Sequence, residues 1–143
     1  MRSLPETTLE RAGAALACGG LASGLIWTLL AALGGASLSG LVMILLLGTL
    51  FSAAGITALA APVWLLLHLA GRRGLGTAAV AGGSLAFLLF LFAQTYGFGL
   101  AAAPLADAGT WTMRWLSAAA TSAGFALIGG GVGALMWWVA YGR

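Results

Sequence analysis

The sequence predicts an all-α integral membrane protein, built as a bundle of four antiparallel transmembrane helices. The chain is 62% hydrophobic and only 6% charged, whereas an average soluble domain is about 25% charged. A soluble surface made from this composition would be one large apolar patch, which soluble proteins avoid. The chain also contains four apolar segments longer than the ~20 residues that a helix needs to cross hydrocarbon. We therefore treat residues 1–143 as a single transmembrane domain.

The first two segments cover about residues 12–33 and 41–69. Pro62 lies in the second segment and cannot donate a backbone hydrogen bond, so it either kinks a helix or ends one near Ala60. We expect one kinked or tilted helix, because the residues after Pro62 remain apolar and Gly71 makes a plausible C-terminal stop. A β-barrel would need short strands of alternating polarity, and the continuous apolar run at residues 42–47 does not fit that pattern.

The third and fourth segments cover about residues 75–98 and 113–140. Residues 98–110 between them contain Pro104, Asp107 and Gly109, and they predict either an external loop or a short helix at the membrane interface. The alternative for the first segment is a cleaved signal peptide. Its long apolar run and the acidic residues Glu6 and Glu10 before it favour a retained helix.

The arginines predict the orientation of the chain. In a four-span topology five of the six basic residues share one side, and one lies on the other: Arg2, Arg11, Arg72, Arg73 and Arg143 against Arg114. Positive residues concentrate on the cytoplasmic side of a membrane. We expect an integral protein, in a bacterial inner membrane, with both termini in the cytoplasm.

Rows of small residues recur within three of the segments. Small side chains let membrane helices approach closely, so van der Waals contact can hold them together. We expect these rows to form helix-packing interfaces, either inside the monomer or against another membrane protein. The rows are Gly20 and Gly24 in the first segment, Ala78, Gly82 and Ala86 in the third, and Ala118, Ser122, Ala126, Gly130 and Ala134 in the fourth.

Two polar features within the segments are candidates for function. His68 is the only histidine, and Trp64, His68 and Arg72 recur every four residues. We interpret His68 as an interfacial residue; a haem contact is the alternative, but two axial histidines would require a second chain. Gln94, Thr95 and Tyr96 are the second feature. We expect Gln94 to bond across helices, with a substrate or an aqueous vestibule as the alternative.

The polar and charged residues of the sequence do not indicate catalysis, a cofactor or nucleic-acid binding. One histidine and one cysteine cannot build a His/Cys metal site in one chain, no segment carries a charge well inside it, and the arginines form no basic stripe. We expect a non-enzymatic accessory, assembly or structural subunit of a larger membrane complex. Its partners would be the lipid bilayer and other membrane subunits or itself. The alternatives are a homo-oligomeric channel or small-solute transporter, and a haem- or quinone-associated electron-transfer subunit.

Overall fold

The computed structural model describes residues 7–97 and 107–142, and all regular structure in these two ranges is helical. Four helices are long and apolar enough to cross a membrane: Leu9–Leu33, Leu38–Leu69, Leu75–Gly97 and Ala108–Tyr141. The predicted all-helical class is therefore confirmed, while membrane insertion and the closed antiparallel bundle stay predictions. Most of the connection expected at residues 98–110 lies outside the described residues, as do Arg2, Glu6 and Arg143.

Three helices begin a few residues before the apolar segments that predicted them, because polar residues cap their first turns. α1 (Leu9–Leu33) is capped by Thr8, α2 (Leu38–Gly55) by Ser37 and α5 (Ala108–Tyr141) by Asp107. Each side chain accepts a hydrogen bond from a backbone N–H that has no partner inside the helix. The Asp107 carboxylate accepts from the backbone and hydroxyl of Thr110, and these bonds lower its pKa below the ordinary value.

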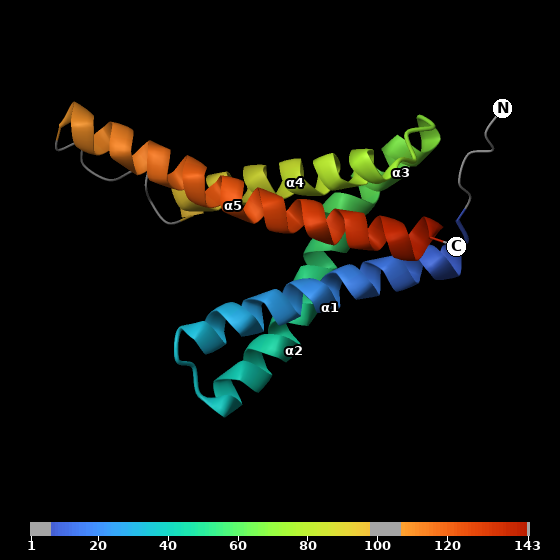
Figure 1. The fold of residues 1–143 in the computed structure, drawn as a ribbon, viewed down its shortest axis with the longest axis horizontal. Helices are drawn as coiled ribbons and strands as arrows, with labels where there is room; N and C mark the ends of the chain where they lie inside the picture. Colours follow the sequence, from blue (N-terminus) through green and yellow to red (C-terminus); the bar gives the residue numbers. More distant parts are fainter. Residues whose placement is uncertain (1–6, 98–106, 143) are drawn as a thin grey trace.

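The second long helix is continuous but irregular. α2 passes into a π-helical turn, η1 (Ile56–Ala60), and then into α3 (Ala61–Leu69). The N–H of Ala61 bonds to the carbonyl of Ile56, five residues earlier. Pro62 has no N–H to continue the ordinary ladder, and π-turns are a recognised way to absorb such a break. α2 and α3 consequently run in different directions (Figure 1). α3 ends at Leu69, two residues before Gly71, whose φ is +73°.

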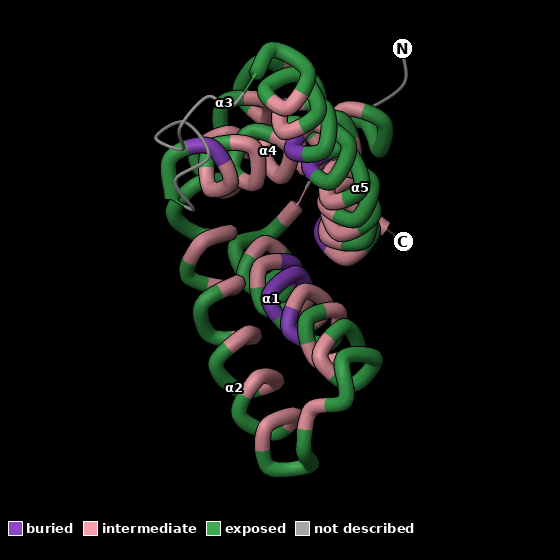
Figure 2. The backbone as a smooth tube through the Cα atoms, turned by 90° about the vertical axis from the view of Figure 1, so that its left-hand side faces the viewer, coloured by how far each residue is buried: buried purple, intermediate pink, exposed green. Residues whose placement is uncertain are grey.

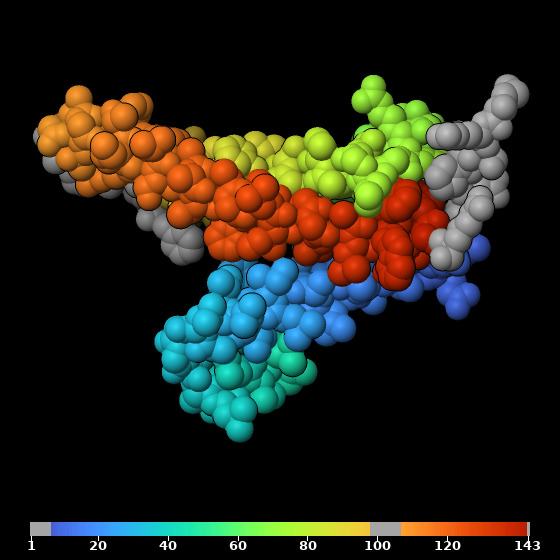
Figure 3. All heavy atoms as spheres, viewed as in Figure 1, coloured from blue at the N-terminus to red at the C-terminus, as the bar shows by residue number. Residues whose placement is uncertain are grey.

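The helices form two hairpins that splay apart. α1 and α2 make one hairpin; α4 (Leu75–Phe92), extended by the π-helical turn η2 (Ala93–Gly97), makes the other with α5. α1 also packs against α5 and so joins the hairpins, whereas α2 projects away from the second hairpin (Figure 3). Buried positions are concentrated on α1 and α5 (Figure 2), and α2 has no buried residue.

Candidate functional site

Backbone carbonyl groups make many of the closest contacts between α4 and α5. A methyl group added to Gly82 would lie 2.5 Å from the carbonyl oxygen of Gly129, and one added to Gly133 would lie 2.6 Å from the carbonyl oxygen of Ala78. Contacts this short leave no room for a Cβ atom on either glycine. The two helices therefore approach each other as closely as small-residue interfaces allow.

The α1–α2 interface is also close, but side chains of α2 cover its glycines. A methyl group on Gly20 would lie 2.7 Å from the Cβ atom of Ala53. The corresponding position on Gly24 is occupied by the Thr49 hydroxyl. This hydroxyl is buried and has no hydrogen-bond partner among the described residues. Gly19, next in sequence to Gly20, faces the Met136 side chain of α5.

Gln94 joins α4–η2 to α5 through its side-chain amide. Its Nε2 donates to Ser122 Oγ at 3.0 Å and to the Ala118 carbonyl at 3.3 Å, and its Oε1 accepts from the Thr121 hydroxyl at 2.8 Å. Ser122 is fully buried, while the neighbouring Thr95 hydroxyl bonds back to the carbonyl of Leu91 in its own helix. Both the nitrogen and the oxygen of the amide therefore bond to α5, so Gln94 links the two helices.

An aromatic cluster holds the end of the molecule where α3 meets the C-terminus of α5. His68 Nδ1 and the Tyr141 hydroxyl are hydrogen-bonded at 2.7 Å, and Trp64 packs beside both rings. Trp137 Nε1 donates to the Arg73 carbonyl at 2.8 Å. These contacts give His68 a partner within its own chain, which the sequence did not predict. We call this set, Trp64, His68, Trp137 and Tyr141, the aromatic cluster.

A groove of about 950 Å³ lies between the two hairpins. Residues from α1, the C-terminal end of α2, η1, α3, α4 and α5 line it, and almost all of them are apolar. Trp27, Phe90 and Phe125 form its wall away from the aromatic cluster, where the two phenylalanine rings stack with centroids 3.8 Å apart. Among the residues that line the groove, Gly13 and Gly55 have open space where a Cβ atom would be.

The structure places the small-residue rows at two different interfaces. Ala78, Gly82 and Ala86 face α5, and Gly20 and Gly24 face α2. In the α5 row, Ala118 and Ser122 are buried, Ala126 and Gly130 meet α4, and Ala134 is half-buried. The closest contacts, however, also involve Gly83 of α4 and Gly129 and Gly133 of α5, which the predicted rows did not include.

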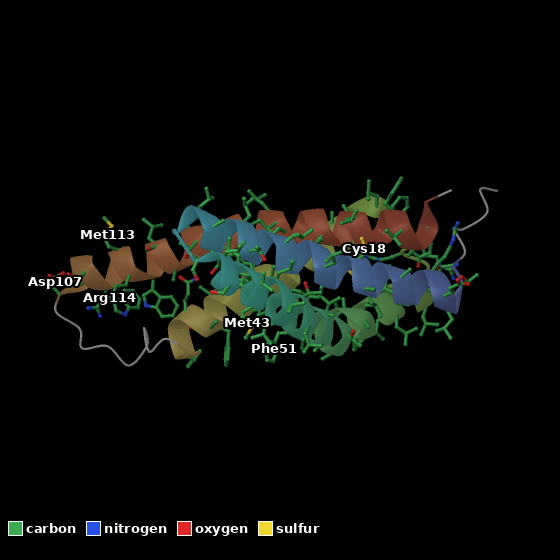
Figure 4. All side chains as sticks on the ribbon, turned by 90° about the horizontal axis from the view of Figure 1, so that it is seen from below. Cys18, Met43, Phe51, Asp107, Met113 and Arg114 are labelled. Carbon is green, nitrogen blue, oxygen red and sulfur yellow. The ribbon has the colours of Figure 1, made fainter. Side chains whose placement is uncertain are left out.

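The described residues hold no cluster of metal-ligating side chains. No group of three or more His, Cys, Asp or Glu side chains in the described ranges is placed to hold a metal ion. Cys18 is a half-buried free thiol on α1, and Asp107 lies far from it, at the opposite end of the molecule from the C-terminus (Figure 4). The features that remain are surfaces and cavities: two packed interfaces, the groove and the exposed flank of α2. No known protein family, curated protein or solved structure matches this chain.

Proposed function

We propose that the chain is an integral membrane protein with both termini in the cytoplasm, and that it acts as a non-enzymatic accessory subunit of a larger membrane complex. The four long apolar helices support insertion. The described arginines Arg11, Arg72 and Arg73 lie at the end of the molecule that carries the C-terminus of α5, which supports the orientation. The antiparallel arrangement of spans is part of the same proposal.

The observation that carries the accessory role is an exposed stripe on α2. Met43, Leu46, Leu47 and Leu50 recur at i, i+3, i+4 and i+7, the spacing of one helix face, and their exposed fractions run from 44% to 63%. α2 packs against α1 and continues into η1, while its outer flank has no packed partner among the described helices. Met43 lies on α2 on the side away from α5 (Figure 4).

A stripe with this spacing is the pattern by which one helix anchors against another. Helix association in lipid depends on packing contacts, since lipid tails are as apolar as leucine. The stripe therefore offers a contact surface to another membrane subunit, or to a second copy of this chain. The groove is apolar and would not solvate ions, so it gives no support to a channel through the monomer.

The accessory role is tested by a matched pair of substitutions. Leu46 on α2 and Leu88 on α4 are each 61% exposed, so Leu46→Ala and Leu88→Ala remove the same surface from different hairpins. Native membranes would be solubilised in mild detergent and the complex sized by native gel, with its subunits identified by mass spectrometry. We expect Leu46→Ala to reduce the share of chain in the complex by roughly tenfold, the effect of a ~1.4 kcal/mol interface contact.

Leu88→Ala serves as the control and should leave that share unchanged. Equal behaviour of the two variants would contradict the α2 interface. A chain that leaves native membranes at the size of the purified monomer would contradict the accessory role altogether.

The topology is tested by reporter fusions at Gly35, Gly71 and Gly109 and at the C-terminus. We expect cytoplasmic signals at Gly71 and the C-terminus, and external signals at Gly35 and Gly109, because the arginine-rich ends remain inside. An external signal at Gly71 would reverse the orientation. Matching signals at Gly35 and Gly71 would rule out one span between them.

A further inference from the structure

The groove between the hairpins has a size and a lining that suit a hydrocarbon chain. Its volume of about 950 Å³ falls within the ~300–1,000 Å³ typical of ligand pockets. An acyl chain is thinner than a membrane-crossing helix, which is about 10–12 Å wide with its side chains, so it needs less of the space between the hairpins.

Small residues keep the groove from being filled by the protein's own side chains. Gly13 of α1 and Gly55 of α2 line it, and a Cβ atom on either would meet nothing within 4 Å. Ala60, Ala78 and Ala81 line it as well. The aromatic wall of Trp27, Phe90 and Phe125 closes the far part of the groove with apolar rings.

Three arginines belong to the segments next to the other end of the groove, although none of them is among its lining residues. Gly13, Trp64 and Trp137 line this end, and Arg11 lies one turn or less from Gly13 on α1. Arg11 is held by a 3.2 Å hydrogen bond from its guanidinium to the Gly142 carbonyl, which brings it to the C-terminus of α5.

Arg73 is held at the same end of the groove. Its Nε donates to the His68 carbonyl at 3.3 Å, and its own carbonyl accepts from Trp137. Arg72 precedes it and is exposed. Of the two carboxylates among the described residues, Glu10 is next to Arg11 in the sequence, and Asp107 lies at the other end of the molecule.

The aromatic cluster separates this charge from the apolar part of the groove. Trp64 and Trp137 each contribute apolar ring surface to the groove, and Trp137 turns its N–H to the Arg73 backbone. Tryptophan and tyrosine favour the boundary between hydrocarbon and headgroups for this reason. The order from arginine through aromatic ring to apolar groove matches that of a phospholipid, from phosphate to acyl chain.

We propose that the groove binds an anionic phospholipid, with an acyl chain between the two hairpins and the phosphate near Arg11, Arg72 and Arg73. The bound lipid fills space that the chain leaves open and so stabilises the two hairpins against each other. The inference rests on the proposed membrane insertion and is independent of the accessory role, because the groove and the α2 stripe are different surfaces.

The test measures lipid binding to the purified, delipidated full chain in detergent. Dioleoyl-phosphatidylglycerol and dioleoyl-phosphatidylcholine would be added separately, with bound lipid counted by native mass spectrometry and stability followed by thermal unfolding. We expect phosphatidylglycerol to be retained and to raise Tm, and phosphatidylcholine to bind about tenfold more weakly or worse, since each arginine near an anionic surface favours binding about fivefold. Equal retention of the two lipids would overturn the headgroup assignment.

Two glycine substitutions test the groove itself. Gly55→Leu places a side chain in the groove, whereas Gly131→Leu places one on an exposed part of α5 where a Cβ atom also meets nothing within 4 Å. We expect Gly55→Leu to lose phosphatidylglycerol and its Tm increase, and Gly131→Leu to keep both. Gly13→Leu is a second groove variant in case Gly55→Leu does not fold. Wild-type binding in folded Gly55→Leu or Gly13→Leu would overturn the proposal, even if the reporter fusions confirm the topology.

Discussion

The two helix hairpins both depend on glycine, but the glycines act in different ways. In the α4–α5 hairpin, Gly82 and Gly133 each face a carbonyl oxygen of the other helix, so main chain meets main chain. In the α1–α2 hairpin, Gly20 and Gly24 face Ala53 and Thr49, whose Cβ and hydroxyl atoms occupy the space above them.

The difference shows which contacts can adjust. A carbonyl oxygen inside a helix moves only if the whole turn moves, whereas a side chain can change rotamer or be replaced by a smaller one. Single side-chain exchanges can therefore change the closest contacts of the α1–α2 hairpin, although the backbone of Ala53 and Thr49 lies close behind them. The polar contacts differ as well, because Gln94 links α4–η2 to α5, while the Thr49 hydroxyl between α1 and α2 has no hydrogen-bond partner among the described residues.

The largest effect is expected at the backbone contact of the α4–α5 hairpin. Gly82→Leu forces a side chain against the Gly129 carbonyl and should destabilise the fold by ~3 kcal/mol, the upper end of overpacking penalties. Gly130→Leu should cost less, because a Cβ atom there lies 3.2 Å from the nearest atom, the Ala79 carbonyl oxygen. Gly131→Leu has open space and is the control. Unfolding in mixed detergent and SDS would rank them, and equal stability of all three would contradict the packing argument.

A smaller effect is expected when the polar link in the same hairpin is removed. Gln94→Leu keeps the side-chain size but deletes the bonds to Ser122 and Thr121 and leaves the buried Ser122 hydroxyl without its amide donor. We expect a loss of about 1–2 kcal/mol, since single interhelical hydrogen bonds in membrane proteins contribute ~0.6 kcal/mol on average and up to ~1.7. Tyr96→Phe, an exposed change in the same turn, is the control in the same unfolding assay. A stability change in Gln94→Leu no greater than in this control would show that the link contributes little.

The sequence predicted the helices well because hydropathy and length depend on local residues. It predicted the four long apolar helices and a stop at Gly71, two residues after α3 ends. It placed three helix starts a few residues late, at the ends capped by Thr8, Ser37 and Asp107. Pro62 indicated an irregular second helix, yet the π-helical turn begins upstream at Ile56. The exact hydrogen-bond register depends on how the whole helix packs, which the local pattern does not contain.

The interfaces were harder to predict because the number of residues per turn of an α-helix is not an integer. A row spaced strictly by four drifts about 40° around the helix at each step, so the α5 row meets α4 at Ala126 and Gly130 but passes beside the closest contacts. Alternating steps of three and four, through Gly129 and Gly133, stay on the contact face and would have been the better signal. The pairing of Gln94 with Ser122 and the groove between the hairpins arise from the way the helices pack in three dimensions. The local residue pattern does not show which residues of two helices lie opposite each other.

The smallest change in stability is expected for a substitution at Thr49, which tests the packing of the α1–α2 hairpin. Thr49→Val replaces a buried hydroxyl that has no hydrogen-bond partner among the described residues, so no bond is lost and the burial of a polar atom is relieved. The new methyl group must fit against Gly24, where the hydroxyl already lies close, and this crowding opposes the gain. We expect the two terms to offset each other, with a net change within about 0.5 kcal/mol.

Thr95→Val is the matched substitution in the other hairpin. Thr95 is 3% exposed, and its hydroxyl donates to the Leu91 carbonyl at 2.8 Å, so its replacement should cost about 1 kcal/mol. The same unfolding assay compares the two variants, each of which exchanges one hydroxyl for one methyl group. If Thr49→Val loses as much stability as Thr95→Val, either the Thr49 hydroxyl contributes a bonding interaction or the crowding against Gly24 exceeds the gain, and the expected balance is wrong. If Thr49→Val is neutral, close packing alone holds α1 to α2.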